Sequence, residues 1–274
     1  MNEQIKLEEI YAPVSNHLRL LEEQLDHVIQ NLCGTNNKEV LEHAFKIPGK
    51  RMRPALLLLS ASAVNPKISL DIKAQLIQLS AAIELIHTAS LIHDDVIDED
   101  SIRRGQKTLN NVFGNKIAVL AGDILNSRAF LIISRQLPVV YHDRLAQMIE
   151  TMGLAEIEQL KSTGTIPTKE EYLKIINGKT AVFIGNSCRF GAMLAGGSEK
   201  EITALENYGM NVGMAYQLID DFIDQEIVSI QYDGLKEAEE YIKEAKNSLG
   251  VLEDTVYKQK LLNFSEYILA YASV

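Results

Sequence analysis

Acidic side chains gather at two places in this sequence, in the stretches DDVID and DDFID. Residues four apart lie on one face of an α-helix, so the first and last aspartates of each stretch project together, with another aspartate beside them. Carboxylates this close repel one another, and at the C-terminal end of a helix they also oppose its macrodipole, so a solvated helix end explains them poorly. The carboxylates that we expect to bind a metal ion are Asp94, Asp95, Asp98, Asp220, Asp221 and Asp224.

Magnesium is the cation that such clusters favour. It takes one or two carboxylates at a site, keeps several waters and completes its octahedron with phosphate oxygens of a substrate. One DDxxD stretch alone would more often be surface decoration, but two copies that each end an apolar helix favour metal binding. Two such clusters could together hold several ions around one diphosphate.

Basic residues near these acids could bind phosphate groups. The segment GKRMRP offers Lys50, Arg51 and Arg53 beside an expected helix start, and both helix N-termini and arginine forks bind anions. Arg103 and Arg104 follow the first acidic stretch directly. The simpler interpretations are a solvated turn for the first group and neutralisation of nearby carboxylates for the second.

Four other polar residues interrupt apolar helical stretches. His87 lies seven residues before Asp94 and therefore on the same helix face. Lys179 and Thr180 interrupt NGKTAVFIG, and Gln217 shares a face with the aspartates of DDFID. A buried polar group must find a hydrogen-bond partner, and that partner could be structural rather than a substrate.

Long helices must position all these residues. In LEEQLDHVIQNL the apolar side chains fall on one helical stripe, and alternating strand patterns are almost absent from the chain. The sequence therefore predicts an all-α protein, with residues 1–274 forming a single domain. The expected helical stretches are 21–32, 54–64, 69–97, 115–136, 144–162, 169–196, 200–224 and 235–249.

Composition excludes some functions. The 274 residues carry a formal net charge of -10, which argues against a nucleic-acid partner because phosphate backbones need a basic face. The two cysteines lie far apart, which is typical of a reducing compartment, and we expect a cytoplasmic protein. We see no signal peptide, and we expect no transmembrane helix because the apolar runs are short.

The motifs together resemble those of the trans-type polyprenyl diphosphate synthase family. GKRMRP, HTASLIHDDVIDEDSIRRG, GKT and YQLIDDFID follow that family's order and spacing from about residue 40 onward. The resemblance implies a bundle of long helices around a deep central cavity, usually in a homodimer. It also implies a prenyltransferase that condenses isopentenyl diphosphate repeatedly with an allylic diphosphate, farnesyl or geranylgeranyl, to an all-trans polyprenyl diphosphate.

The resemblance assigns the first group of residues to the allylic substrate. The aspartates would hold about two or three Mg²⁺ ions against its diphosphate. Arg103 and Lys179 would bind the same diphosphate directly. Thr180 and Gln217 would lie where the family positions the reacting carbocation and the allylic diphosphate, so that Lys179, Thr180 and Gln217 form the catalytic set.

The resemblance assigns a second group to isopentenyl diphosphate. Lys50, Arg51, His87 and Arg104 would form its pocket, while Arg53 fits the motif without a ligand role. Bond breaking would leave a carbocation that the double bond of isopentenyl diphosphate attacks, and the apolar walls would exclude water.

Small residues before the first acidic stretch indicate a long product. In the family, a bulky aromatic side chain there blocks elongation, whereas this chain has Ala89 and Ser90 at the chain-length positions. No Phe or Tyr occurs between Ser69 and Asp98. We therefore expect hexaprenyl, heptaprenyl or octaprenyl diphosphate.

Relative to the family, we expect several tens of residues to be absent between Asp224 and about Gly234. Either the gene carries a deletion, or the sequence leaves out a mobile loop; the second interpretation is favoured because active-site lids are often mobile. The sequence leaves open a small second subunit, and oily products would bring at most transient membrane contact.

Three alternatives to a synthase remain. A class I terpene cyclase would share the helices and DDxxD, but would not need the isopentenyl diphosphate pocket. A non-catalytic or regulatory subunit of a two-component prenyl synthase need not keep both acidic stretches. A helical scaffold would carry its acids as surface decoration.

Overall fold

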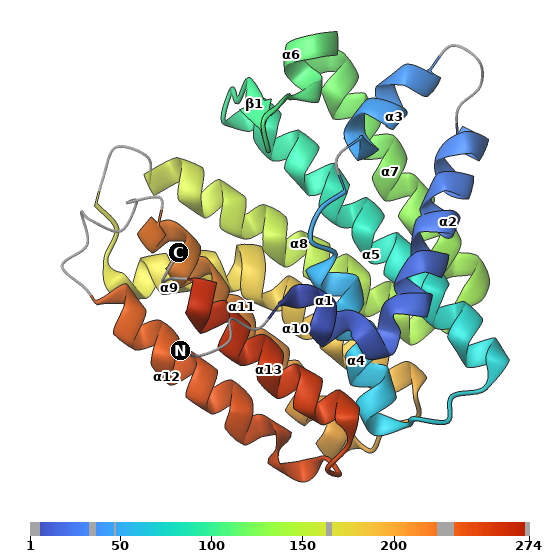
Figure 1. Cartoon of the computed structure of the whole chain (residues 1–274). Helices are drawn as coiled ribbons and strands as arrows, with labels where there is room; N and C mark the ends of the chain where they lie inside the picture. Colours follow the sequence, from blue (N-terminus) through green and yellow to red (C-terminus); the bar gives the residue numbers. More distant parts are fainter. Residues whose placement is uncertain (1–5, 33–36, 47, 163–165, 224–232, 272–274) are drawn as a thin grey trace. The chain divides into compact units, whose positions relative to one another are not determined.

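The chain folds almost entirely into helices, as the computed structural model in Figure 1 shows. The structure describes residues 6–32, 37–46, 48–162, 166–223 and 233–271. The only strands among these residues form one two-stranded hairpin. The all-α prediction is therefore confirmed. In the first half, the elements are α1 Leu7–Tyr11, η1 Ala12–Val14, α2 Ser15–Leu32, α3 Lys38–Phe45, α4 Met52–Val64, α5 Leu70–Ile97, β1 Ile102–Arg103, β2 Gln106–Lys107, α6 Leu109–Phe113 and α7 Asn115–Gln136. In the second half, they are α8 Val139–Ser162, α9 Lys169–Ile176, η2 Asn177–Ala181, α10 Val182–Leu194, α11 Glu199–Ile223, α12 Gly234–Ser248, η4 Leu249–Val251 and α13 Val256–Tyr271.

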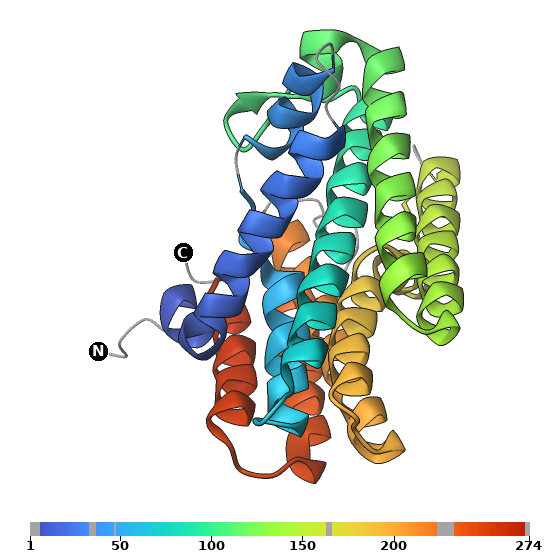
Figure 2. The same ribbon diagram turned by 90° about the vertical axis from the view of Figure 1, so that its right-hand side faces the viewer.

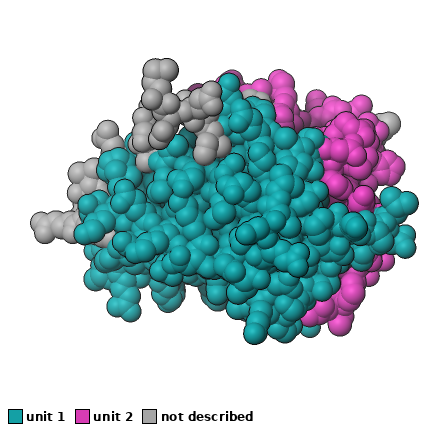
Figure 3. Space-filling model, turned by 60° about the horizontal axis from the view of Figure 1, so that its bottom comes forward, with its two compact units in different colours: residues 1–15, 55–72, 143–274 teal, residues 16–54, 73–142 magenta. Residues whose placement is uncertain are grey.

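Contacts between residues divide the chain into two compact units, which Figure 3 shows in different colours. Unit 1 comprises residues 1–15, 55–72 and 143–274, and unit 2 comprises 16–54 and 73–142. Each boundary between the units falls inside a helix, namely α2, α4, α5 or α8. That residues 1–274 act as a single domain stays a prediction.

Three long helices, α2, α5 and α7, run side by side in unit 2 (Figures 1 and 2). The predicted stripe of α2 is buried, including Leu21 and Leu25, which expose 0% and 1% of their surfaces. The middle of α5 is buried around its whole circumference, which is the pattern of a core helix. A hydrogen bond of 3.2 Å from Gln24 to Gln78 joins α2 to α5.

Helix α11 is the centre of unit 1, where it contacts α10, α12 and α13. Its Gly213 lies against η2: a Cβ at this glycine would come within 2.6 Å of the Cα of Ala181. A larger residue would push the two backbones apart. Earlier in α11, the buried hydroxyl of Tyr208 donates a 2.7 Å hydrogen bond to the carbonyl of Leu261 on α13.

The helix bounds match the predicted stretches closely, with one interruption. The expected helix 169–196 is divided by η2, one turn of π-helix over Asn177–Ala181. Such turns insert an extra residue into a helix and are frequent at functional sites. The join between α11 and α12 falls on residues that the structure mostly leaves undescribed, so the expected missing loop stays a prediction.

Helices α5 and α7 are long and apolar enough, by length and composition, to cross a membrane. Core helices of other proteins meet the same criterion, so the expectation of no transmembrane helix stays a prediction. The most apolar window of α5 is 67% buried inside the protein, which is typical of a core helix, whereas that of α7 is 33% buried. Length and composition alone do not place either helix in a membrane.

Candidate functional site

The first acidic stretch lies at the C-terminal end of α5, where its three predicted ligands differ in exposure. Asp95 is buried, Asp94 is half-buried and Asp98 is exposed. Burial is the main reason why the pKa of Asp95 is raised, and the neighbouring Asp98 and Asp100 raise it further, while Arg103 lowers it. No group of three or more His, Cys, Asp or Glu residues among the described residues is arranged to hold a metal ion by itself. Carboxylates with this exposure fit Mg²⁺, which needs only one or two of them.

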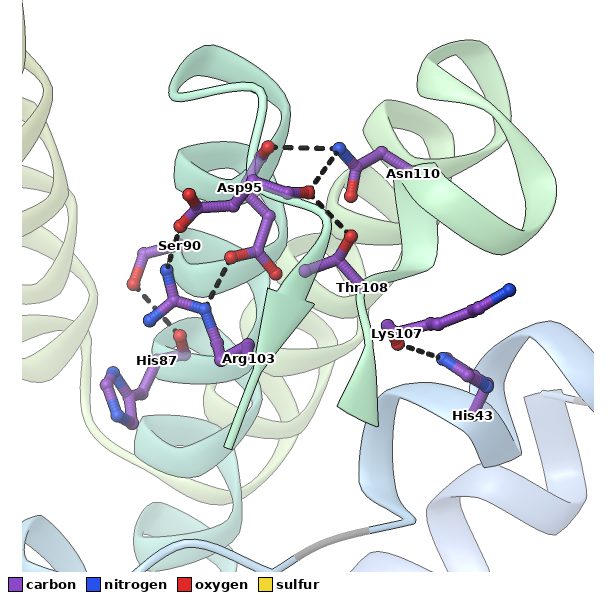
Figure 4. A network of polar contacts seen from close by, with 9 residues as sticks. His43, His87, Ser90, Asp95, Arg103, Lys107, Thr108 and Asn110 are labelled. Atoms are coloured by element: carbon purple, nitrogen blue, oxygen red, sulfur yellow. Dashed lines mark hydrogen bonds and ion pairs between the residues drawn. The ribbon is translucent and has the colours of Figure 1, made fainter. Parts of the chain in front are cut away.

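A β-hairpin presents the two arginines beside these acids. Arg104 and Gly105 occupy its two-residue turn with φ of 52° and 75°, as a type I′ turn requires. Figure 4 shows Arg103 reaching back from this hairpin to Asp95, with which it forms an ion pair. The second guanidinium nitrogen of Arg103 lies 3.5 Å from Asp100.

Polar contacts hold the hairpin to α5 and α3, as Figure 4 also shows. The side-chain amide of Asn110, on α6 after the hairpin, donates 3.0 Å hydrogen bonds to the carbonyl of Asp95, near the end of α5, and to that of Asp100, just after it. At the other end, a ring nitrogen of His43 lies 2.7 Å from the carbonyl of Lys107. These contacts add to the ion pair of Arg103 and Asp95 in holding the hairpin beside the acids.

A pocket in unit 2 collects the predicted isopentenyl diphosphate ligands, apart from the exposed Lys50. Its lining includes Arg51, Glu84, His87, Asp95, Arg103 and Arg104. Gly49 also lines it, and a Cβ there would come within 2.8 Å of the Arg104 guanidinium. The absence of a side chain at Gly49 therefore lets Arg104 lie over the loop before α4.

Arg53 rather than Arg51 is next to His87. The Arg53 guanidinium lies 3.1 Å from Nε2 of His87, and since arginine can only donate, the imidazole accepts and is neutral, with its proton on Nδ1. Burial, followed by the charges of Arg53 and Arg104, holds the pKa of His87 well below its usual range. Arg51 instead forms ion pairs with Glu22 and Glu84.

The polar residues of unit 1 form a second network. Thr180, on the π-helical turn, donates a 2.8 Å hydrogen bond to Oε1 of Gln217. Because that oxygen accepts, the other end of the amide donates to Oδ1 of Asp221, at 2.6 Å. Tyr172, from α9, donates to Oδ2 of the same carboxylate, also at 2.6 Å. Two neutral donors thus orient the Asp221 carboxylate.

The remaining predicted residues have these positions. Lys179 forms an ion pair with Glu156 on α8 and donates a hydrogen bond to Gln159, at 2.8 Å. Asp220 is half-buried beside Asp221, and Asp224 lies outside the described residues. On α5, the chain-length residues differ: Ala89 exposes 0% of its surface, and Ser90 donates a hydrogen bond of 2.9 Å to the carbonyl of His87.

Several residues in these networks were not predicted from the sequence. Glu84 had a readable signal, because it is a lone carboxylate in the apolar stretch AAIELI. Glu22, Asn110, Glu156 and Tyr172 had none, since each is an ordinary residue for its position and gains its partner only in the folded chain.

Comparison with known proteins gives consistent matches. The polyprenyl synthetase family matches residues 35–263. A short chain isoprenyl diphosphate synthase of Methanothermobacter thermautotrophicus is 37% identical over 220 residues, covering 77% of this chain and 66% of that protein. Heptaprenyl diphosphate synthase component 2 of Geobacillus stearothermophilus is 34% identical over 221 residues, covering 80% of this chain and 67% of that protein. The match thus spans about two thirds of the length of these relatives.

A solved structure shares the fold. Polyprenyl synthase from Caulobacter crescentus, solved with calcium and isoprenyl diphosphate, superposes with a TM-score of 0.87 at 21% identity, over 98% of this chain and 99% of that one. At this identity the likeness shows the fold alone.

Proposed function

Because this chain belongs to the polyprenyl synthetase family, we propose that it is a Mg²⁺-dependent trans-prenyltransferase that condenses isopentenyl diphosphate with an allylic diphosphate. The observation that carries the proposal is the arginine-rich pocket around a neutral histidine at the end of α5, directly beside the buried carboxylate of Asp95. An anion pocket next to a metal-binding carboxylate suits a reaction whose substrates and leaving group are diphosphates.

The acidic residues would hold the metal ions. Asp94 and Asp95 from α5, Asp98 just after it, and Asp220 and Asp221 from α11 would supply oxygen ligands, which are the ligands that Mg²⁺ prefers. Bound Mg²⁺ would supply positive charge to the departing diphosphate. The hydrogen bonds from Gln217 and Tyr172 support a ligand role for Asp221, because outer-shell donors commonly orient metal-binding carboxylates.

The allylic diphosphate would also be bound by Arg103 and Lys179, whose present partners are carboxylates. A diphosphate would compete for both cations, since it offers more negative charge and more acceptor oxygens than a carboxylate. Thr180 and Gln217 would lie against the reacting allylic carbon. Their mutual hydrogen bond fixes both side chains before substrate binds.

The isopentenyl diphosphate pocket would use Lys50, His87 and Arg104, and the geometry favours adding Arg53. Its guanidinium is next to His87, whereas three nitrogens of Arg51 already donate to carboxylates. The uncharged imidazole can donate a hydrogen bond from Nδ1 to a phosphate oxygen. The positive charge that attracts the anion comes from the arginines.

A long product, in the hexaprenyl to octaprenyl range, is the proposal for chain length. Its support is the small size of Ala89 and Ser90 and the lack of aromatic residues along α5. The two relatives named above, one a short-chain synthase and one a heptaprenyl synthase component, are about equally similar to this chain. The proposal of a long product therefore rests on these residues of α5.

A homodimer is proposed for the assembly, because the outer face of α7 is apolar. Leu120 exposes 60% of its surface, and Ile117 and Ile124 expose 42% and 41%. These residues have the spacing of a helix–helix seam. One relative is a component of a heptaprenyl synthase, which keeps a second subunit open. Cytoplasmic location and transient membrane contact during product release are part of the same proposal.

Incorporation of labelled isopentenyl diphosphate into farnesyl diphosphate, with Mg²⁺ and with EDTA, tests the function. We expect Mg²⁺-dependent elongation, and a loss of about 10² to 10³ in rate for Asp94→Ala if the acids stabilise leaving-group charge. Cyclic hydrocarbons without incorporation would indicate a terpene cyclase. Activity that appears only when a second protein is added would indicate a subunit of a two-component synthase.

A further inference from the structure

The loop before α4 contains a residue in an unfavourable backbone conformation. Arg51 has φ of 50°, in the left-handed region that a residue with a Cβ seldom adopts. Such a conformation persists only where surrounding contacts hold it. The contacts around its side chain show what does so.

Two carboxylates hold the Arg51 guanidinium. Its Nε donates to one oxygen of Glu22 at 2.7 Å and its Nη2 donates to the other at 2.9 Å, in a two-pronged arrangement. Its Nη1 donates to Glu84. The side chains of Arg51 and Glu84 are 11% and 5% exposed, so their ion pair is largely shielded from water, whereas the Glu22 side chain is 45% exposed. Glu22 comes from α2 and Glu84 from α5, so the loop is tied to two helices of unit 2.

The tied loop and the start of α4 lie beside the anion pocket. Gly49, two residues before Arg51, leaves room for the guanidinium of Arg104, and Arg53, two residues after Arg51, contacts His87. A change in the backbone at Arg51 would therefore move both sides of the pocket at once.

We propose that Glu22 is a positioning residue for diphosphate binding, acting through Arg51 on the loop that shapes this pocket. The inference rests on the proposed function for its biological meaning. It goes beyond the family match, which begins at residue 35 and does not include Glu22. The N-terminal helix α2 would thus contribute to substrate affinity without touching substrate.

Charge alone predicts the opposite effect, which makes the inference easy to test. A carboxylate near an anion pocket repels the anion, so its removal should tighten diphosphate binding if Glu22 acts only through its charge. If Glu22 positions the loop, its removal should weaken binding although the pocket becomes more positive. The sign of the change separates the two explanations.

The experiment is a calorimetric titration of inorganic pyrophosphate into the full chain with EDTA present, so that the basic pocket is measured without metal. We expect Glu22→Gln to raise the Kd about tenfold, as for the loss of a hydrogen bond between charged groups. Glu22→Asp keeps the charge but shortens the side chain, and should also weaken binding. Glu23→Gln is the matched control, because Glu23 is the next residue of α2 and, among the described residues, pairs with the exposed Arg19 rather than with the loop. The Kd of this variant for pyrophosphate should stay within about twofold of wild type.

Steady-state kinetics supply the second measurement. The KM for isopentenyl diphosphate should rise in Glu22→Gln with kcat changed less than about twofold, because the pocket and not the chemical step is disturbed. Unchanged or tighter pyrophosphate binding in folded Glu22→Gln and Glu22→Asp would overturn the inference, as would a fall in kcat at constant KM. A wild-type protein that binds pyrophosphate but forms no prenyl product would refute only the proposed function.

Discussion

Replacing Tyr172 by Phe removes one oxygen atom and tests whether Asp221 is a metal ligand. The lost hydroxyl donates to Oδ2 of Asp221 at 2.6 Å, while Gln217 continues to donate to Oδ1. A hydrogen bond to a charged group contributes about 1.5 to 3 kcal/mol, and outer-shell partners of metal ligands typically change metal affinity by about 10- to 100-fold. We expect Tyr172→Phe to weaken Mg²⁺ binding by a factor in that range.

Two assays measure this effect. Electron paramagnetic resonance of free Mn²⁺, titrated into the protein with pyrophosphate present, gives the affinity directly. The Mg²⁺ concentration at half-maximal prenyl transfer gives it during turnover, where we expect a higher requirement with a nearly normal rate at saturating Mg²⁺. Tyr257→Phe on α13 is the control, since Tyr257 belongs to the same unit but to neither polar network.

The result that would refute the reasoning is a Tyr172→Phe protein whose Mn²⁺ affinity and Mg²⁺ requirement both lie within about twofold of wild type. Asp221 would then be oriented for another purpose, such as holding α9 against α11. A lower melting temperature alone would not support the metal role, because any lost buried hydrogen bond has that effect.

Two further predictions concern α5. The pKa of His87 is lower in the folded protein than its ordinary 6.5, so its contribution to stability is complete above about pH 6.5 and is lost as the pH falls below it. As the pH falls from 7.5 to 5.5, the free energy of unfolding, measured with urea, should therefore fall less in His87→Gln than in wild type. The difference between the two proteins should be at most about 1.4 kcal/mol per pH unit. Equal losses in both proteins would contradict the assignment of a neutral histidine. Ala89→Phe should shorten the products to farnesyl or geranylgeranyl length, seen by chromatography of the dephosphorylated products, although overpacking at this buried site will cost about 1 to 3 kcal/mol of stability; unchanged product length would exclude Ala89 from the path of the growing chain.

Local patterns in the sequence were sufficient to predict the helices and the acidic stretches. The apolar stripe of α2 and the long, mostly apolar α5 follow from side-chain periodicity and composition, which one sequence displays directly. The placement of Asp95 and Asp221 at helix ends follows from the same pattern. Their surroundings could not be predicted, because the choice of Arg103 or Tyr172 as partner depends on tertiary contacts.

The unpredicted features share a physical cause. The ion pair of Glu22 and Arg51 joins residues far apart in the chain. Nothing in the sequence distinguishes Glu22 from its neighbour Glu23 on α2, which has a different partner. The π-helical turn at Asn177–Ala181 continues an ordinary helical pattern and differs only in which carbonyl each amide selects. The neutral state of His87 depends on the arginines gathered around it by folding.

The boundaries between the two compact units have a practical consequence for anyone who wishes to divide this protein. Every boundary lies inside a helix, and each unit is assembled from separate stretches of sequence. No single cut in a surface loop can therefore release either unit intact, and no continuous piece of the gene encodes one. Fusion partners and affinity tags inserted into the chain belong at loops within a unit, because an insertion at a boundary would interrupt the hydrogen bonds of a helix.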